Sequence, residues 1–348
     1  MNRIKLQTKS QNETNNQSMP TANPREASAP PLLRVNGLKK HYSASGKSGF
    51  RRSVVKAVDG VSFDLREGET YGLVGESGCG KSTLGKTILR LAEPTEGEAV
   101  YRGVDLFKQS RRSLQAYRRE LQMVFQDPFS SLNPRQIVGQ ALEEPLAIHG
   151  IGSPKERTAR AMEMLQTVGL QMEHYYRLPH ELSGGQRQRI GLARALILNP
   201  RIVICDEPVS ALDVIIQSQI INLMRKLQAE LNLTYLFIAH DIAVVRHISD
   251  RIGIMYLGKL VEEAPTDELF ANPRHPYTQV LLSAVPVPDP SAAKRQRIVL
   301  EGDLPSPLDP PTGCAFHTRC PYATDRCRSE TPPLREVEAG HSAACHLL

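Results

Sequence analysis

Apolar and polar residues alternate along two early stretches of the chain, residues 32–38 and 57–65. A period of two is the pattern of a half-buried strand, and residues 97–101 suggest a third strand of this kind. A loop rich in serine, glycine and basic residues separates the first two strands, at residues 43–52. Together these stretches predict an antiparallel layer of sheet that flanks the core of the fold.

Four later runs are apolar almost throughout, as buried strands are: residues 71–74, 121–125, 202–205 and 235–239. Residues 84–91 and 190–198 have the composition of helices, and the second of these is followed by Asn199 and Pro200, which stop it. A further helix carries an apolar stripe with spacings of four, three, four and four: Ile216, Ile220, Leu223, Leu227 and Leu231. Strands that alternate with helices predict an α/β fold, with a mainly parallel sheet covered by helices on both faces.

Changes in composition divide the chain into parts. Residues 1–30 hold few apolar residues and many Asn, Gln, Ser and Pro, which predicts a disordered tail. The core is expected at residues 31–265, with a mostly helical insert at about 127–182. Proline becomes frequent after residue 265, so we expect an extension at 266–348 that ends in a small, loop-rich, cysteine-rich module.

The composition is that of an ordinary globular protein, with 40% hydrophobic and 23% charged residues among 348. The formal net charge of +6 is modest, and basic pairs such as Arg51–Arg52 and Arg118–Arg119 are scattered along the chain. Scattered charges favour a solvated surface and no nucleic-acid partner. A phosphate-rich partner, such as nucleic acid or lipid headgroups, is the alternative.

No run approaches the ~18–20 apolar residues that a membrane-spanning helix requires, and the N-terminus lacks the apolar segment of a signal peptide. We therefore expect a cytoplasmic chain. If it serves a membrane process, another polypeptide is expected to span the bilayer.

The most specific chemistry lies between the first buried strand and the helix after it. This stretch consists of Gly75, Glu76, Ser77, Gly78, Cys79, Gly80, Lys81, Ser82 and Thr83. A strand, a glycine-rich loop and a helix in this order form a P-loop, in which backbone N–H groups and the helix dipole hold phosphate. We expect Lys81 to reach the β- and γ-phosphates of a nucleotide and Ser82 to ligate Mg²⁺.

A second candidate anion site precedes the helix at 190–198, and it consists of Ser183, Gly184, Gly185 and Gln186. Ser183 is a natural N-cap, and the glycines let backbone N–H groups approach an anion. Because the P-loop already holds its own phosphates, this segment suggests contact with the nucleotide of another subunit. Asp213 lies in a later segment that is suited to the same subunit contact.

Polar residues follow three of the buried strands, at the edge where open α/β sheets bind ligands. Gln126 can contact Mg²⁺ or the attacking water, and Asp206 can hold Mg²⁺ through a bridging water. Glu207 can act as the general base on the attacking water, and His240 can hydrogen-bond a γ-phosphate. Tyr42 is a candidate to stack on adenine, with an ordinary surface aromatic as the alternative.

Four of the six cysteines crowd into the last 35 residues, at Cys314, Cys320, Cys327 and Cys345. In a cytosolic chain this crowding suggests metal ligation more than disulfides. The gaps of five, six and seventeen residues fit neither the C-x2-C zinc pattern nor the bacterial ferredoxin pattern. Spacing alone therefore leaves open a [4Fe–4S] cluster, a zinc ion, and free or disulfide-bonded thiols.

Taken in order, these motifs resemble those of ABC-transporter ATPase subunits over about residues 32–265. The resemblance implies a P-loop (RecA-like) ATPase core with an antiparallel β-subdomain and a helical subdomain. It also implies a head-to-tail dimer with two ATPs, each bound with Mg²⁺ between one subunit's P-loop and the other's Ser-Gly-Gly segment. The catalytic motifs show no departure from the family pattern, so we expect hydrolysis at both sites if the partner's motifs are intact.

DNA-repair and chromosome ATPases share this cassette but carry a long coiled coil between the two nucleotide-binding motifs. Lys81 and Ser183 are only 102 positions apart, which leaves no room for one. Translation-associated ATPases of this type usually hold two cassettes, whereas this chain has one.

Residues 126–135, the His-Pro-Tyr-Thr sequence at 275–278 and the terminal cysteines resemble dipeptide/oligopeptide permease ATPases, in particular their second, F-type subunit. This resemblance implies peptide import at the cytoplasmic face of the inner membrane. The implied partners are a second homologous ATPase, two transmembrane permease subunits and an extracytoplasmic peptide-binding protein. Nickel, glutathione and other peptide-like solutes are the alternative cargoes. The resemblance also favours a structural [4Fe–4S] cluster over zinc.

Overall fold

The computed structural model describes residues 30–44, 53–127, 132–285 and 305–348, and residues 31–348 form one compact unit. The expected disordered tail, apart from residue 30, and most of the expected loop at 43–52 lie outside the described residues. The same is true of residues 128–131, at the start of the expected helical insert.

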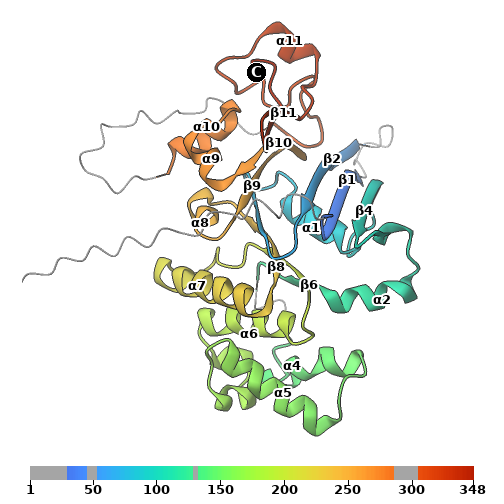
Figure 1. Cartoon of the computed structure of the whole chain (residues 1–348), viewed down its shortest axis with the longest axis vertical. Coiled ribbons are helices and arrows are strands. Elements are labelled where there is room, and N and C mark those ends of the chain that lie inside the picture. Colours follow the sequence, from blue (N-terminus) through green and yellow to red (C-terminus); the bar gives the residue numbers. More distant parts are fainter. Residues whose placement is uncertain (1–29, 45–52, 128–131, 286–304) are drawn as a thin grey trace, which may run out of the picture. The chain divides into compact units, whose positions relative to one another are not determined.

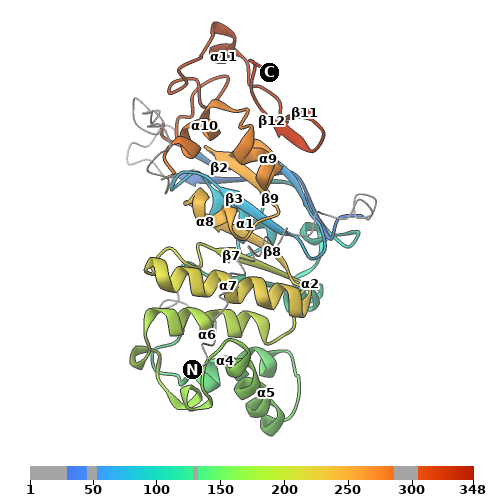
Figure 2. The same cartoon turned by 60° about the vertical axis from the view of Figure 1, so that its left-hand side comes forward.

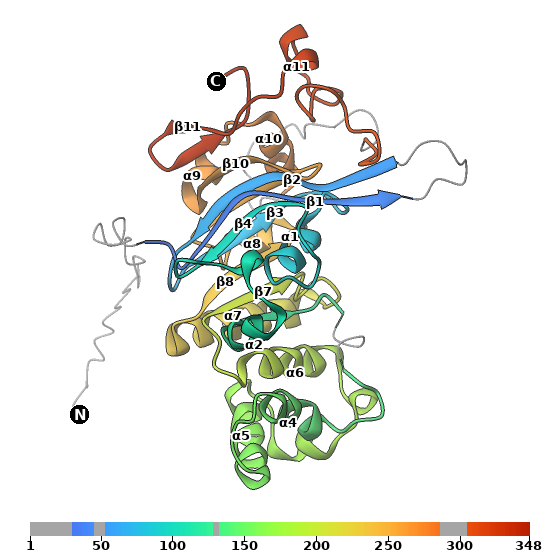
Figure 3. The same cartoon turned by 90° about the vertical axis from the view of Figure 1, so that its right-hand side faces the viewer.

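A four-stranded antiparallel sheet has the strand order β2-β1-β4-β5 (Figure 3). Its strands are β1 (Leu33–Ala44), β2 (Ser53–Leu65), β4 (Glu96–Tyr101) and β5 (Val104–Asp105). The antiparallel layer was predicted, but β1 runs six residues beyond its expected end. Its second half is polar and is held by backbone pairing, in which Tyr42 lies opposite Val55, so the apolar pattern could not reveal it.

A larger sheet of eight strands has the order β11-β12-β10-β9-β3-β8-β7-β6 (Figure 1). The five strands from β9 to β6 are parallel, and β3 lies between β9 and β8: β3 (Thr70–Val74), β6 (Leu121–Val124), β7 (Ile202–Asp206), β8 (Thr234–Ala239) and β9 (Arg251–Tyr256). Antiparallel strands complete one edge: β10 (Lys259–Pro265), β11 (Arg335–Glu338) and β12 (His341–Ala343). The predicted mainly parallel sheet is confirmed.

Helices cover both faces of the parallel strands (Figure 2). On one face, α1 (Lys81–Ile88) packs between the two sheets, and an added Cβ at Gly85 would lie 3.0 Å from Ile204. The other face carries α8 (Ile242–Arg246), whose Val245 side chain would lie 2.2 Å from a Cβ added at Gly72. Also in this layer are α6 (Gly184–Leu196) and α7 (Val214–Leu231).

Three expected helices are present, but their first residues or their buried residues differ from the expectation. The first helix begins at Lys81 rather than at 84, and α6 begins six residues before its expected start, because the segment that precedes residue 190 forms its capped first turn. The stripe on α7 is only partly correct, since Leu231, its last residue, is 44% exposed. The fully buried residues of α7 are Ile220, Ile221, Met224 and Leu227.

The helical insert contains α4 (Val138–Ile148) and α5 (Pro154–Thr167), as predicted, followed by two short 3-10 helices, η3 (Met172–Tyr176) and η4 (Pro179–Glu181). Ser153 caps α5 through a reciprocal pair of hydrogen bonds with Glu156. The polar helix α2 (Arg111–Glu120) and the 3-10 turn η2 (Leu106–Lys108) before it were not predicted. Leu114 is buried in α2, but the helix has no wide apolar face from which it could be predicted.

The C-terminal part begins with α9 (Thr266–Ala271) and α10 (Pro276–Ser283), and α11 (Asp325–Ser329) follows later. Strand β12 pairs with β10, so the chain returns to the sheet after residue 305. In the described unit, this part and the pair α4–α5 lie at opposite ends (Figure 1). The expected division at residue 265 stays a prediction.

Candidate functional site

The P-loop is shaped by two glycines that sit against neighbouring backbone. A Cβ on Gly75 would lie 2.1 Å from the Met255 carbonyl oxygen, and one on Gly80 would lie 1.9 Å from that of Ala57. Gly80 also has a φ of +108°, which side-chain-bearing residues rarely adopt. No larger residue fits at either position, so the loop is held closely between β2 and β9.

Lys81 begins α1 and turns its side chain back into the loop. Its ammonium donates hydrogen bonds to the carbonyl oxygens of Gly75, at 2.7 Å, and Glu76, at 3.0 Å, and the residue is only 4% exposed. The Cys79 side chain is buried beside this ammonium. A buried cation at the N-terminus of a helix is an arrangement that binds phosphate.

Ser82 and Asp206, the two residues predicted to bind Mg²⁺ beside the P-loop and at the end of β7, lie in direct contact. The Ser82 hydroxyl donates to Asp206 Oδ1 at 2.6 Å. Burial raises the pKa of the Asp206 carboxyl, and the hydrogen bond from Ser82 together with the nearby Lys86 ammonium partly opposes that rise. Two oxygen ligands at one point fit Mg²⁺, which prefers carboxylates and hydroxyls.

The three predicted catalytic side chains converge on one oxygen atom. Glu207 Oε2 accepts a hydrogen bond from Gln126 Nε2 at 2.8 Å and lies 3.3 Å from His240 Nδ1. Glu207 has a φ of +48°, a strained backbone for a residue with a side chain. Its N–H donates to the Ile238 carbonyl at 2.9 Å, which fixes this conformation against β8.

The segment at the start of α6 forms the capped helix end that the sequence predicts. Ser183 Oγ accepts from the Gln186 N–H at 3.3 Å, and Gln186 Oε1 accepts from the Ser183 N–H at 2.9 Å. A Cβ added at Gly185 would lie 2.7 Å from Ile216 of α7, whereas one at Gly184 would only touch Leu212. These contacts run to α7 and to the segment directly before it, and the role of Ser183–Gln186 at another subunit's nucleotide stays a prediction.

Asp213 and Tyr42 lie at the ends of secondary-structure elements. Asp213 is the N-cap of α7, and its Oδ1 accepts from the Ile216 N–H at 3.0 Å. Tyr42 lies near the end of β1, is 41% exposed, and has the Lys40 ammonium 4.5 Å from the centre of its ring. Their proposed roles, in subunit contact and in adenine stacking, stay predictions.

The four C-terminal cysteines gather in one place. The pKa values of the Cys314, Cys320 and Cys345 thiols are raised, first by burial, and nearby thiolates of the group add to the rise. The backbone N–H groups of Phe316, Tyr322, His346 and Leu347 oppose part of this rise in pKa. Four thiols brought together in one module are candidate ligands for a group that binds thiolates.

Among the four described C-terminal cysteines, no three sulfurs lie within 4.8 Å of one another. In the described part of the chain, the group of His and acidic residues that meets this limit is Glu268, Glu338 and His341. Which group the cysteines bind stays a prediction.

Two residues at the P-loop were not singled out from the sequence. The Tyr277 hydroxyl accepts a hydrogen bond from the Glu76 N–H at 3.0 Å. Arg319 Nη1 lies 3.0 Å and 3.1 Å from the two carboxylate oxygens of Glu76. Tyr277 belongs to the His-Pro-Tyr-Thr sequence, which marked a resemblance without suggesting a contact, and nothing in the pattern around Arg319 indicated one.

Comparisons with known proteins agree with this geometry. A family model described as ABC transporter matches residues 58–210, and one described as the oligopeptide/dipeptide transporter C-terminal region matches residues 261–327. The oligopeptide transport ATP-binding protein AppF of Bacillus subtilis (strain 168) is 55% identical over 321 residues, which cover 91% of this chain and 97% of AppF. YkfD of the same strain is 54% identical over 319 residues, which cover 91% of this chain and 95% of YkfD.

A solved structure has the same core. The ATP-binding cassette MJ0796, a dimer bound to ADP and Pi in a post-hydrolysis state, superposes with a TM-score of 0.61 at 32% identity. The match covers 68% of this chain and 99% of that one. No helix among the described residues is both long and apolar enough to span a membrane. The chain therefore belongs to the ATP-hydrolysing, ATP-binding subunits of ABC transporters, and it carries the C-terminal region of the oligopeptide/dipeptide type.

Proposed function

We propose that this chain powers the import of dipeptides and oligopeptides through partner membrane subunits. The observation that carries the proposal is that one chain has both the P-loop with its catalytic residues and an oligopeptide/dipeptide-type C-terminal region. The name and high identity of AppF support the same substrate class. In this scheme residues 31–265, with the insert at 127–182, form the nucleotide-binding domain, and 266–348 form the extension.

The residues of the site divide the chemistry of hydrolysis among them. Lys81 and the P-loop N–H groups bind the phosphates of ATP. Ser82, Asp206 and Gln126 would hold Mg²⁺, which neutralises phosphate charge when bound. Glu207 removes the proton from the attacking water, and its orientation comes from its strained backbone and from Gln126. His240 lies beside the same carboxylate, where it can bind the γ-phosphate.

A second ATPase subunit completes each site in this proposal. The capped N-terminus of α6 presents backbone N–H groups from two glycines, which suits the γ-phosphate of an ATP bound to the partner. The dimeric state of MJ0796 supports the arrangement. We propose a heterodimer with a similar chain, in which this chain is the F-type subunit. We also propose that it works with two permease subunits and, indirectly, a peptide-binding protein, at the cytoplasmic face of the inner membrane.

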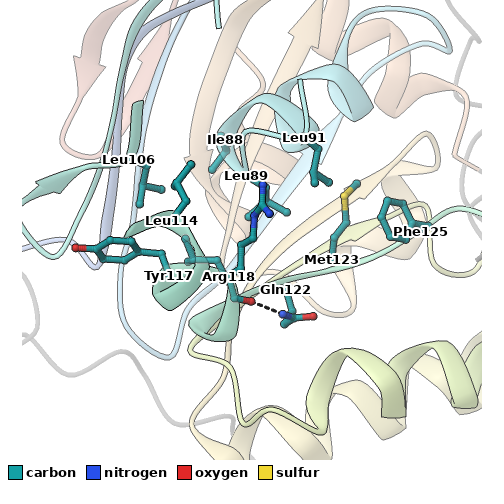
Figure 4. Close-up of a pocket in the computed structure, with 11 residues that line it drawn as sticks. Ile88, Leu89, Leu91, Leu106, Leu114, Tyr117, Arg118, Gln122, Met123 and Phe125 are labelled. Atoms are coloured by element: carbon teal, nitrogen blue, oxygen red, sulfur yellow. Dashed lines mark hydrogen bonds between the residues drawn. The ribbon is translucent and has the colours of Figure 1, made fainter. Parts of the chain in front are cut away.

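An apolar groove supplies the surface for a membrane partner. It has a volume of about 190 Å³ and lies where the end of α1, α2 and β6 meet, directly before Gln126 (Figure 4). Leu91 and Phe125 line it, and they are 52% and 41% exposed. We propose that a short apolar helix of a permease subunit docks here. Closure of the ATP site would then move the partner through the strand that ends at Gln126.

We propose a [4Fe–4S] cluster on Cys314, Cys320, Cys327 and Cys345, with zinc as the alternative. The gathering of the four thiols in one module supports a bound group there, and the resemblance to peptide-permease ATPases favours the cluster over zinc. Bound there, it would cross-link segments of the loop-rich module. Anaerobically purified protein should be brown, absorb near the visible blue, and contain iron and sulfide. Colourless protein with stoichiometric zinc would contradict the cluster.

The transport function is tested with the complete complex in liposomes. We expect its ATPase rate to rise several-fold when a peptide-loaded binding protein is added, and labelled peptide to accumulate inside. Stimulation by nickel or glutathione, with no response to peptides, would overturn the peptide assignment. Leu91→Asp should reduce co-purification with the permease subunits, whereas Ile148→Asp, at a 63% exposed residue outside the groove, should not.

A further inference from the structure

Glu76, the second residue of the P-loop, is held from the C-terminal region by two separate contacts. Its backbone N–H donates to the Tyr277 hydroxyl at 3.0 Å, and its carboxylate receives Arg319 Nη1 at 3.0 Å and 3.1 Å. The carbonyl oxygen of the same residue accepts the Lys81 ammonium at 3.0 Å. Any movement of Glu76 therefore changes the position of the Lys81 ammonium, which binds phosphate.

Buried neighbouring side chains hold both contacts in place. Tyr277, Tyr256 and Phe316 are fully buried, and their ring centres lie 4.7, 5.3 and 5.4 Å apart. The Arg319 side chain is 9% exposed, and its Nη1 also lies 3.5 Å from the Tyr256 hydroxyl. Exposed ion pairs contribute little to stability, but a charge-assisted pair held against buried aromatic rings keeps a fixed geometry.

Arg319 and Phe316, which take part in these contacts, belong to the cysteine module. Arg319 directly precedes Cys320, and Phe316 is two residues after Cys314. The Cys314 N–H donates to the Cys327 carbonyl at 2.8 Å, so the segment from 314 to 320 is folded against the cysteine that follows it. Arg319 can meet Glu76 only when this segment has its folded form.

We propose that Arg319, with Tyr277, is a positioning residue of the ATP site: it holds the P-loop in its ATP-binding shape and makes nucleotide affinity depend on an intact cysteine module. Glu76 is then already ordered before ATP binds, so less of the binding free energy is lost to the entropy cost of ordering the P-loop. Coupling between two sites is reciprocal, so bound ATP also stabilises the module. The proposal rests on the ATPase function, but not on peptide as the cargo or on iron as the bound metal.

The test is equilibrium binding of a fluorescent ATP analogue to the full-length chain. Arg319→Ala and Glu76→Gln should each raise Kd about 10-fold, and the double variant should be no weaker than the single ones, because both remove one interaction. For Arg319→Ala, the rate at saturating ATP in the complete complex should change less than two-fold. Arg319→Lys should recover part of the affinity. Arg326→Ala is the matched control, because this 63% exposed arginine of the same module pairs with Glu330 and not with the P-loop.

Metal content and thermal unfolding show whether the cysteine module of Arg319→Ala is still folded. If the module is folded and the Kd for the ATP analogue equals that of the unaltered chain, the proposal is wrong. If the module has unfolded, Glu76→Gln replaces Arg319→Ala in the test, because it leaves every residue of the module in place, and an unchanged Kd in that variant shows the proposal to be wrong.

Reciprocity gives a readout that does not use activity. Labelling of Cys320 by a thiol reagent, followed by peptide mapping, should be several-fold slower with ATP and Mg²⁺ than without them. The difference should vanish in Arg319→Ala and persist in Arg326→Ala. Equal labelling rates with and without ATP in the unaltered chain would overturn the coupling. Failure of peptide transport would affect neither binding nor labelling, and the binding test does not depend on which metal the module holds, so the two proposals fail separately.

Discussion

At the scale of single residues, the site depends on side chains that cannot relax. Glu207 is 11% exposed, its backbone is strained, and one of its oxygens is shared by an amide and an imidazole. A carboxylate fixed in this way presents its lone pairs in one direction, where an attacking water can be placed. Strain of this kind persists only where the surrounding structure holds it.

Replacing Glu207 with glutamine should separate chemistry from binding. Glu207→Gln keeps the shape of the side chain but removes the base, so we expect the ATPase rate to fall by about 10²- to 10⁴-fold. The Kd for ATP should stay within a few-fold of the original. Glu230→Gln, at an exposed acid on α7, is the control and should leave both quantities unchanged. Undiminished turnover in Glu207→Gln would remove this residue from the role of base.

His275 gives a prediction for stability at low pH. It is 1% exposed, its Nδ1 accepts from the Tyr277 N–H, and burial lowers its pKa to about 4. The folded chain keeps this imidazole neutral, whereas the unfolded chain protonates it below about 6.5. Its contribution is therefore complete above pH 6.5 and is lost as the pH falls toward 4.

The loss should amount to about 2 kcal/mol between pH 7.5 and pH 5. His275→Asn retains a good N-cap for α10 but cannot titrate in this range. Denaturant unfolding at both pH values should give a smaller drop in stability for the variant. Equal drops would show that His275 does not cause the acid sensitivity.

Distance along the chain explains which site residues the sequence revealed. Gly75 to Ser82 could be predicted because strand, loop and helix are consecutive, and Glu207 because it directly follows an apolar run. Tyr277 and Arg319 lie 201 and 243 positions from Glu76, and their contacts depend on the folded sheet. One sequence without the fold gives no reason to place them beside the P-loop.

At the scale of elements, glycines set how closely helices approach their neighbours. Gly139 of α4 lies against the ring of Tyr175, and a Cβ there would come within 2.3 Å of the ring. The Tyr175 hydroxyl donates to Glu143 of the same helix at 2.6 Å, so the ring has little freedom to move. The core of the insert is built around this approach, which the sequence did not reveal although it predicted a mostly helical insert.

Gly139→Ala should therefore destabilise the chain by about 1–3 kcal/mol, because the added methyl forces the ring aside. ATP affinity should not change, because Gly139 packs against Tyr175 of the insert itself. Gly191→Ala is the matched control: it lies inside α6 with no atom within 4 Å of an added Cβ, so it should leave stability unchanged or raise it slightly. Urea unfolding of both variants measures the difference. A stability loss as large in Gly191→Ala would contradict the role of close packing.

At the scale of the whole molecule, one chain contributes parts to two different nucleotide sites in the proposed dimer. The start of α6 is attached by its contacts to α7, while the P-loop is attached to β2, β9 and the C-terminal region. Each chain can therefore be altered at one site while the other is left intact.

Ser183→Asp tests this arrangement. Aspartate caps a helix as well as serine does, so α6 should form normally, but its charge would oppose the γ-phosphate of the partner's ATP. We expect unchanged ATP binding to the isolated chain, together with at least a 10-fold loss of hydrolysis in the assembled complex. Ser183→Asn, a neutral and equally good cap, should lose less. If Ser183→Asp hydrolyses ATP at the full rate, the segment does not border a partner's nucleotide.

The contact between Arg319 and Glu76 also has a consequence for the making of the chain on the ribosome. The arginine is translated 243 positions after the glutamate, which takes on the order of tens of seconds at synthesis rates of ~5–20 residues per second. During that interval a nascent P-loop is exposed to cellular ATP without its support. Tight binding would begin only after the cysteine segment has emerged and folded, so an unfinished subunit sequesters little nucleotide.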